Sequence, residues 1–486
     1  MRPTREEFLS LAAEYPVVPV TLELLADRDT AVSAFEKLVG EQPGFLLESV
    51  EGGDRWARWS FLGWDPAFTL LSRDGNCRVE GADVKVGQGN PLEVLEDLLA
   101  RFRSPDLSGL PPLHSGVVGY LGYDLVRYIE RLPNRPRDDL GLPEMILQVV
   151  GSLAALDRFR QTITLVRNVF VGNDPGRQYD RATAYLERAR ERLGRPPSFR
   201  PRPRPDFRSS GPVQALIERS AFEKAVDRAK EYIREGDAYQ VVLSQRWEVP
   251  HQGDLFPVYR ALRLLNPSPF LFFVRHPDLA MAGSSPELMV RVREGRVVSR
   301  PIAGTRPRGA TPEEDAARER ELLADPKERA EHVMLVDLAR NDLGRVAEFG
   351  SVEVDELMVV ERYSHVMHLV SGVSGRLRPD VGPVDVLRAT FPHGTVSGAP
   401  KVRAMEIIDE LEPVARGPYA GAVGYLDFSG NVDTAIALRT VVAARGRAWV
   451  QAGAGVVADS DPAAEYEETM SKAAAGLAAL DGAGDV

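Results

Sequence analysis

Cysteine is almost absent from this chain of 486 residues, which carries only Cys77. One cysteine cannot form a disulfide within the chain, and it cannot supply a cysteine-rich metal site. A composition of this kind suits a reducing compartment. We therefore expect a cytoplasmic protein without disulfides.

Long apolar segments are also missing. No apolar run approaches the length that is needed to span a bilayer. The first seven residues are rich in charge, and the apolar segment of a signal peptide does not follow them. The sequence thus predicts neither a membrane span nor a secretory signal.

The chain has no excess of positive charge, since its formal net charge is −11. Such a balance argues against a protein that binds nucleic acid over a broad surface. It says little about small anionic substrates, because these respond to local charge. The hydrophobic content of 44% is ordinary for a soluble globular protein.

Several familiar catalytic motifs are absent. The sequence contains no H-E-x-x-H zinc motif, and the spacing of residues 394–401 (GTVSGAPK) does not match a phosphate-binding loop. His365 and His368 are three positions apart in a segment that reads as a strand. Side chains at this spacing on a strand face opposite ways, so we do not expect the two histidines to share a metal.

A segment rich in proline and arginine divides the chain. Residues 196–212 can form neither a helix nor a central strand, which predicts an extended, solvated linker. The expected organisation is an N-terminal half over 1–195, the linker, and a C-terminal domain over 213–480. Strand-like segments mostly follow one another, with single helices between them. This order favours an α+β fold, with large antiparallel sheets packed together and helices outside, over a doubly wound parallel sheet.

Two pairs of acidic residues have helical spacing. Glu328 and Glu331 follow an Asp-Pro helix start, and Glu465 and Glu468 follow another near the C-terminus. Like charges that share one place need solvent or a cation between them. Four such carboxylates could bind one Mg²⁺, which prefers oxygen ligands. Two solvated acidic faces are the simpler alternative, and Glu328 could also serve in a capping box.

Two polar residues interrupt apolar strand patterns. Gln240 lies within residues 239–243, and Arg439 lies within residues 435–442, which otherwise read as one buried strand. A buried arginine needs an anion beside it. That anion could be an acidic side chain of the chain itself or the carboxylate of a substrate, held by two hydrogen bonds.

Taken together, these motifs resemble the chorismate-utilising enzymes, and among them those that form anthranilate. The resemblance covers nearly all of residues 215–475, with the motifs in family order, and a looser match extends into the N-terminal half. The matching segments are 237–247, 266–269, 284–287, 300–306, 328–344, 366–371, 391–401, 417–421, 435–440 and 451–472.

The resemblance implies specific roles in binding. Mg²⁺ would join the ring carboxylate of chorismate to Glu331 and Glu468, with Glu328 and Glu465 in support. The enolpyruvyl carboxylate would be held by Tyr419, Arg439 and the backbone of Gly455. The further substrate-binding positions that it implies are Gly304, Thr305 and Gly453.

The resemblance also implies a reaction in two steps. Ammonia would add at ring C2 while Glu287 protonates the C4 hydroxyl, and His368, with Thr395 nearby, would then take the C2 proton as pyruvate leaves. Relatives that add water carry a lysine at the position of Gln240, and relatives that form aminodeoxychorismate carry one at the position of Ala303. This chain has neither lysine, which favours ammonia as the nucleophile and anthranilate as the product.

The source of ammonia is not visible in the sequence. Cys77 lacks the histidine context of a glutaminase nucleophile, so a separate glutamine amidotransferase subunit is implied. The resemblance further implies feedback inhibition by tryptophan, bound at Leu47, Glu48, Ser49, Pro269, Phe270 and Leu271. Many relatives have Tyr-Met where this chain has Phe270-Leu271. Two alternatives stay open: an enzyme that forms aminodeoxychorismate, and a non-catalytic scaffold that senses tryptophan.

Overall fold

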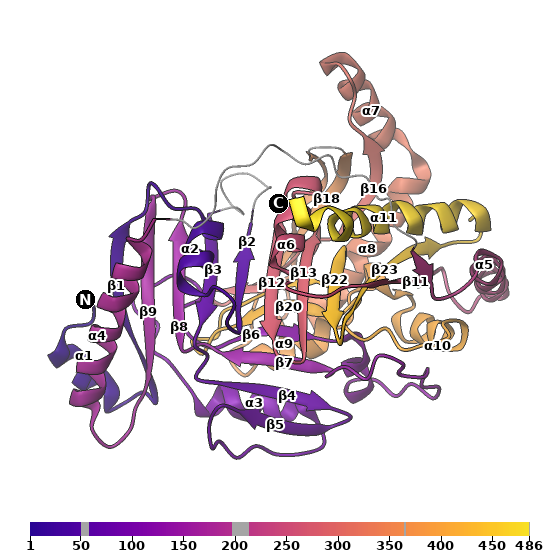
Figure 1. Cartoon of the computed structure of the whole chain (residues 1–486). Helices are drawn as coiled ribbons and strands as arrows, with labels where there is room; N and C mark the ends of the chain where they lie inside the picture. The colour runs from indigo at the N-terminus through magenta and orange to yellow at the C-terminus, as the bar shows by residue number, and fades with distance from the viewer. Residues whose placement is uncertain (50–57, 197–212, 364–365, 486) are drawn as a thin grey trace.

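The structure is a computed structural model, and it describes residues 1–49, 58–196, 213–363 and 366–485 (Figure 1). The predicted linker at 196–212 lies outside the described residues except for its first position. His365, whose pairing with His368 the sequence argued against, also lies outside them.

Two large antiparallel sheets form the centre of the molecule, which confirms the predicted α+β class. Within the described residues, the 12-stranded sheet has the order β1 (Val17–Leu25), β9 (Thr162–Phe170), β8 (Ser152–Asp157), β3 (Trp59–Trp64), β2 (Gly44–Glu48), β12 (Phe270–His276), β13 (Leu279–Ser285), β22 (Thr440–Ala444), β23 (Arg447–Val456), β11 (Gln240–Pro250) and β10 (Gln214–Ala215), with β19 (Gly398–Ala399) beside β11. The 11-stranded sheet has the order β16 (Ile302–Pro307), β18 (Val366–Arg376), β15 (Arg296–Ser299), β14 (Leu288–Arg293), β21 (Val432–Ile436), β20 (Ala422–Leu426), β6 (Val117–Leu121), β7 (Met145–Val149), β4 (Phe68–Arg73) and β5 (Asn76–Glu80), with β17 (Glu353–Arg362) beside β18.

The two sheets pack face to face because their strands are apolar on both faces. On β2, Phe45 points into the layer between the sheets, whereas Leu46 points to the opposite face. On β7, Ile146 lies in the central layer and Leu147 on the outer side. A strand that is buried on both faces reads as a continuous apolar run, which is why these segments show little alternation in the sequence.

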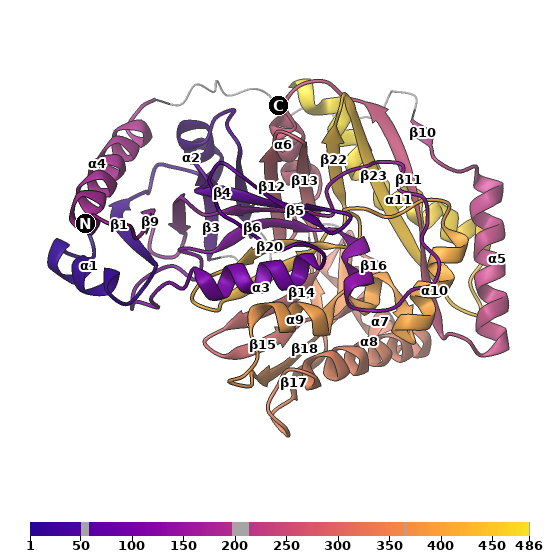
Figure 2. The same cartoon turned by 90° about the horizontal axis from the view of Figure 1, so that it is seen from below.

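Helices cover both outer faces of this pair of sheets (Figures 1 and 2). The helices that share a core with the 12-stranded sheet are α1 (Arg5–Ala12), α2 (Ala31–Leu38), α4 (Pro175–Leu193), α6 (Phe256–Leu265), α11 (Pro462–Gly482), α5 (Arg219–Glu235) and α10 (Lys401–Leu411). The helices on the 11-stranded sheet are α3 (Pro91–Arg101), α7 (Pro312–Ala324), α8 (Pro326–Gly344) and α9 (Pro383–Thr390), and the short 3-10 helices are η1 (Tyr123–Tyr128), η2 (Gly394–Val396) and η3 (Ala483–Asp485).

Strands from the two halves of the chain are interleaved. β2 pairs with β12, so that Glu48 lies opposite Leu271. In the other sheet β6 pairs with β20, with Gly119 opposite Gly424. The division into an N-terminal half and a C-terminal domain stays a prediction, and strands of both parts share both sheets.

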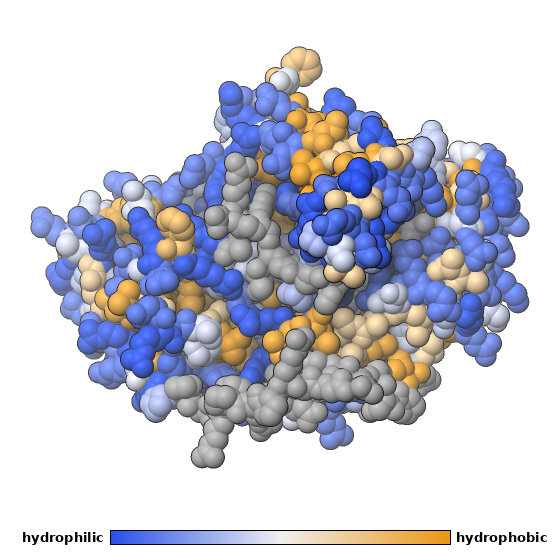
Figure 3. Space-filling view, turned by 90° about the horizontal axis from the view of Figure 1, so that it is seen from above, coloured by the Kyte–Doolittle hydropathy of each residue, from blue (hydrophilic) through white to orange (hydrophobic). Residues whose placement is uncertain are grey.

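No helix of the described residues is long and apolar enough to cross a membrane. On the face drawn in Figure 3, apolar side chains lie among many hydrophilic ones.

One strand prediction is wrong, and the error concerns the site. Residues 435–442 are not a single strand, because β21 ends at Ile436 in one sheet and β22 begins at Thr440 in the other. Between them the chain crosses from sheet to sheet, and Arg439 adopts a φ of 47°. This left-handed conformation is uncommon for a residue other than glycine. The apolar pattern conceals the crossing because both strands are buried.

Candidate active site

The side chains that the sequence singled out converge from segments far apart in the chain. Thr305 on β16 lies opposite His368 on β18, and its hydroxyl is 3.1 Å from the His368 Nδ1. Gln240, the first residue of β11, donates from Nε2 to the Glu331 Oε1 on α8 at 3.0 Å. The structure therefore brings together residues that come from both sheets and from α8.

Two glycines at the end of β23 allow close contact inside this site. A Cβ at Gly453 would lie 2.7 Å from the Tyr419 hydroxyl, and a Cβ at Gly455 would lie 2.7 Å from the Gln240 Nε2. Any side chain at either position would displace a predicted site residue. These glycines are therefore explained by the approach of Tyr419 and Gln240.

Glu287 is a buried carboxyl group at the join between β13 and β14. Its backbone is fixed by the Ser285 hydroxyl, which accepts from the Glu287 amide at 3.3 Å, and by the Ile436 amide, which donates to its carbonyl at 3.1 Å. The Oε1 atom is buried without a hydrogen-bond partner. Burial raises the pKa of Glu287 from 4.5 to about 8, although the Thr395 hydroxyl and the charge of Lys472 oppose the shift. At neutral pH this group can donate a proton.

His368 is held as a neutral base. Its Nδ1 lies 3.0 Å from the Gly304 carbonyl, which can only accept, so that Nδ1 carries the hydrogen and Nε2 carries the lone pair. Burial lowers the pKa of the imidazole from 6.5 to about 4, and the nearby charges of Arg439 and Lys472 act in the same direction. An imidazole in this state can accept a proton at Nε2.

Arg439 has no acidic partner among the described residues. Its Nη1 donates to the Asn266 Oδ1 at 3.2 Å, and this acceptor is a neutral amide. Burial lowers the pKa of the guanidinium, which is the expected effect on a desolvated cation. Arg439, His368 and Tyr363 line a small cavity of about 30 Å³ together with Pro269. Of the two anions that the sequence left open, a carboxylate of the chain is not found beside Arg439 in the part of the chain that the structure describes.

The four acids lie on α8 and α11, and charges from both helices act on Glu331. Burial raises the pKa of Glu331, and the charges of Glu328 and Glu468 raise it further, against a hydrogen bond from Gln240. Arg306 Nη1 is 3.0 Å from the Glu328 Oε1, and Lys472 Nζ is 2.7 Å from the Glu468 Oε1.

As placed here, no three acidic, histidine or cysteine side chains of the described residues are close enough to form a metal cage. The donor set nevertheless suits a hard cation. The Glu465 Oε2 is buried without a hydrogen-bond partner, and burial raises the pKa of this acid as well. The charge of Glu468 acts on both Glu465 and Glu331. An oxygen-preferring divalent ion would provide the partner that the unsatisfied Glu465 oxygen lacks.

The alternative of a capping box at α8 is wrong. The Asp325 side chain does cap the helix, accepting from the backbone amide of Glu328 at 3.3 Å. The Glu328 side chain, however, bonds to Arg306 and not back to the cap.

Sequence reasoning missed three residues of the site. Lys472 pairs with Glu468 and donates to the Gly453 carbonyl at 3.0 Å, and Asn266 holds Arg439. His393 lies 3.6 Å from the Glu287 Oε1. The spacing of Lys472 four residues after Glu468 was a visible signal, whereas no local pattern marks Asn266 or His393.

The predicted tryptophan-binding residues lie on two paired strands. Leu47 and Glu48 end β2 and Ser49 follows it, while Phe270 and Leu271 begin the neighbouring strand β12, directly after Pro269. Glu48 is buried, and its carboxylate is already engaged. The donors to it are Arg158 at 3.1 Å, Arg263 at 3.0 Å and the Tyr259 hydroxyl.

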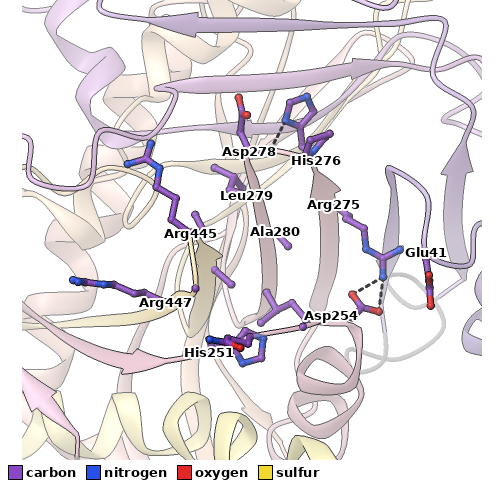
Figure 4. A pocket seen from close by; sticks show the side chains of 17 residues that line it. Glu41, His251, Asp254, Arg275, His276, Asp278, Leu279, Ala280, Arg445 and Arg447 are labelled. Carbon is purple, nitrogen blue, oxygen red and sulfur yellow. Dashed lines mark hydrogen bonds and ion pairs between the residues drawn. The ribbon is translucent and has the colours of Figure 1, made fainter.

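Larger hollows lie elsewhere. One of about 670 Å³ is found at the ends of β13 and β22 that point away from the site (Figure 4). Two arginines that line this hollow already have partners within the protein. Arg275 pairs with Asp254 at 2.6 Å, and Arg445 donates to the Leu140 and Gly141 carbonyls. Another, of about 1030 Å³, is lined by α1 and β1. Neither hollow contains a residue of the site.

Comparisons with known proteins identify the family of the chain. Residues 43–478 match the family described as chorismate binding enzyme. Anthranilate synthase component 1 of Acetivibrio thermocellus is 46% identical over 495 residues, covering 100% of this chain and 99% of the relative. The same protein of Mycolicibacterium smegmatis is 48% identical over 497 residues, covering 98% and 93%.

Solved structures give the same assignment. The crystal structure of anthranilate synthase component I from Streptococcus pneumoniae has a TM-score of 0.78 and 38% identity, covering 93% of this chain and 99% of that one. The menaquinone-specific isochorismate synthase from Escherichia coli shares the fold, with a TM-score of 0.71 and 19% identity over 98% of each chain. The chain therefore belongs to the chorismate-binding enzymes and, within them, to the family of anthranilate synthase component I.

Proposed function

We propose that this chain converts chorismate and ammonia into anthranilate and pyruvate. The observation that carries the proposal is Arg439, a desolvated cation whose hydrogen-bond partner is a neutral amide, in one cavity with the base His368. The names of the relatives support the same reaction.

The first step exchanges a hydroxyl group for an amine. A bond forms between the ammonia nitrogen and ring C2, both ring double bonds move by one position, and the C4–O bond breaks. The nitrogen then loses one proton to become the amine. Hydroxide is a poor leaving group, so Glu287 gives its proton to the departing oxygen and water is released. The raised pKa of Glu287, about 8, keeps that proton available at neutral pH.

The second step makes the ring aromatic. His368 takes the C2 proton at Nε2, the electron pair enters the ring, and the C–O bond to the enolpyruvyl group breaks. The enolate that leaves is protonated to pyruvate. Arg439 and the Tyr419 hydroxyl hold the carboxylate of this group, and the Gly304 carbonyl holds the imidazole in the required tautomer.

Glu331 and Glu468 would bind Mg²⁺, with Glu465 and Glu328 in support. The ion would neutralise the charge of the ring carboxylate. Each main ligand already has a side-chain partner, which the ion would displace. Gln240 donates to Glu331, and Lys472 pairs with Glu468.

Ammonia is proposed as the nucleophile because Gln240 is a neutral amide and cannot activate water. Its Nε2 already donates to Glu331. A separate glutamine amidotransferase would supply the ammonia, since Cys77 is buried and burial raises the pKa of its thiol. Tryptophan is proposed as an inhibitor that binds where β2 and β12 meet.

The direct test is incubation with chorismate, Mg²⁺ and ammonium while anthranilate fluorescence is followed, with and without tryptophan. Ammonium should support turnover, and glutamine alone should not. Turnover would exclude the non-catalytic scaffold. Aminodeoxychorismate as the accumulating product would refute the proposed reaction.

Changing Asn266 to aspartate should weaken substrate binding. The new carboxylate would neutralise Arg439 and compete with the enolpyruvyl carboxylate, so that the KM for chorismate rises about tenfold. Steady-state kinetics would measure the change. Asn90→Asp is the matched control, because Asn90 caps α3 away from the site and aspartate caps equally well. An unchanged KM would mean that Arg439 does not bind the substrate.

Changing His368 to methionine should slow the second step more than the first. Without the base, loss of the C2 proton becomes about a hundredfold slower, and the amino intermediate accumulates. Chromatography of the intermediate, together with a pyruvate assay, would measure both steps. His251→Met is a suitable control, because His251 lines the remote hollow of Figure 4. An unchanged ratio of intermediate to pyruvate would remove His368 from the elimination.

A further inference from the structure

η1 is a short helix in the N-terminal part of the chain, and the proposed reaction gives it no role. It follows β6 and lies against the turn at residues 416–421, which leads into β20 and carries Tyr419. The amide of Tyr123, the first residue of η1, donates to the Gly417 carbonyl at 2.7 Å. The Asp124 Oδ2 accepts from the Gly417 amide at 3.0 Å. Both polar groups of the Gly417 backbone are therefore bonded to η1.

This turn contains backbone conformations that need support from their surroundings. Gly417 has a φ of 60°, and Ala420 has a φ of 62°. A left-handed alanine is uncommon, and it persists only where the surrounding structure holds it. The Ala420 amide donates to the Ala437 carbonyl at 3.1 Å, and the Ala437 amide donates to the Gly421 carbonyl at 2.8 Å. Tyr419 thus lies between a point that is fixed by η1 and a point that is fixed by the crossing segment after β21.

The ring of Tyr419 packs against a buried cation at the start of the same turn. The Arg416 Nε donates to the Glu412 Oε2 at 2.9 Å, and its two terminal nitrogens donate to two backbone carbonyls. The guanidinium carbon lies 4.7 Å from the centroid of the Tyr123 ring and 5.6 Å from that of the Tyr419 ring. Arg416 therefore joins the aromatic ring of η1 to the aromatic ring of the site.

The hydroxyl of Tyr419 reaches the end of β23, since a Cβ at Gly453 would lie 2.7 Å from it. Burial raises the pKa of this phenol, so it keeps its hydrogen at neutral pH and can donate to a carboxylate. Arg439, which is assigned to the same carboxylate, has supports of its own: Asn266, and the Ser284 amide, which donates to its carbonyl at 3.2 Å. The position of Tyr419 can therefore be disturbed separately from that of Arg439.

We propose that Asp124 is a positioning residue for substrate binding: its carboxylate fixes the turn that carries Tyr419 and thereby sets the affinity for the enolpyruvyl carboxylate. Asp124 is itself held in place. The Arg127 Nε lies 3.5 Å from its Oδ1, and Arg127 also pairs with Asp409 at 2.8 Å. The inference rests on the proposed role of Tyr419 in binding that carboxylate.

Changing Asp124 to alanine tests the inference, because the Gly417 amide then loses its acceptor. The affinity for chorismate should fall about tenfold, whereas kcat at saturating chorismate should change little, because Asp124 contacts neither the proposed acid nor the proposed base. Calorimetric titration with chorismate and Mg²⁺ in the absence of ammonium measures the affinity without turnover. Asp124→Asn keeps an acceptor oxygen for the amide and should restore the parental affinity.

Three further variants make the test specific. In a Tyr419→Phe background, which lacks the hydroxyl, Asp124→Ala should cause no further loss of affinity. Asp174→Ala is the matched control, because the Asp174 carboxylate accepts from the Arg177 amide at 3.0 Å at the start of α4. This helix packs on β1 and β9, at the other end of the 12-stranded sheet from β11. Asp124→Glu, which moves the acceptor by one methylene group, replaces Asp124→Ala if the alanine variant does not fold.

The outcomes separate the two proposals. A parental affinity in Asp124→Ala would overturn the role of Asp124, and so would an equal loss in Asp124→Asn. An equal loss with and without the Tyr419 hydroxyl would also overturn it, because the effect would then not pass through Tyr419. A parental chain that binds no chorismate would instead refute the proposed function.

Discussion

Replacing Glu287 with glutamine is expected to lower the kcat for anthranilate formation by about a thousandfold. Glutamine keeps the size of the side chain but has no proton of suitable acidity for the departing hydroxyl group. Binding of chorismate should change little, because its enolpyruvyl carboxylate is assigned to Arg439 and Tyr419 and its ring carboxylate to the proposed Mg²⁺. Steady-state fluorescence with saturating ammonium would give kcat and KM separately.

The fold should survive this substitution. Burial favours the neutral form of Glu287, with a pKa of about 8 against an ordinary value of 4.5. The stability that this protonated group contributes is present below pH 4.5 and is lost as the pH rises to about 8. Glutamine cannot ionise, so the variant should unfold no more easily than the parent at pH 8. Glu294→Gln, at the exposed turn between β14 and β15, is the matched control. Parental kcat in Glu287→Gln would exclude this residue as the acid.

Replacing Glu468 with glutamine is expected to abolish measurable turnover. The change removes one of the two acids proposed as the main ligands of Mg²⁺, and it also frees Lys472, whose ammonium lies 2.7 Å from the Glu468 Oε1. A lysine that has lost its carboxylate partner, next to the remaining proposed ligands, adds repulsion to the loss of a ligand. Because Glu468 is solvent-exposed, the variant should fold and melt as the parent does.

Glu467→Gln is a close control for this prediction. Glu467 is the adjacent residue on α11, but its carboxylate pairs with Arg219, 2.7 Å away. Calorimetric titration with Mg²⁺ in the presence of chorismate should show binding to the parent and to Glu467→Gln, and none to Glu468→Gln. Near-parental turnover of Glu468→Gln would rule out this residue as a metal ligand.

The architecture could be predicted from the sequence because the strand patterns are local. Strands that follow strands, with few helices between, gave the antiparallel α+β class that the two sheets show. The crossing at Arg439 could not be predicted, because an apolar run continues through it and only the φ of 47° reveals the turn. The acid pairs were visible from helical spacing, since the spacing fixes which side chains share a face of one helix.

The sequence by itself determined which side chains are available: acids in pairs, an arginine and a glutamine within apolar runs, and glycines that end a strand. Only the tertiary structure decided what surrounds them. It placed a neutral amide, Asn266, against Arg439, a lysine against Glu468, and His393 against both Thr395 and Glu287. The reason is that protonation and charge depend on burial and on partners distant in the chain, and neither is encoded in local spacing.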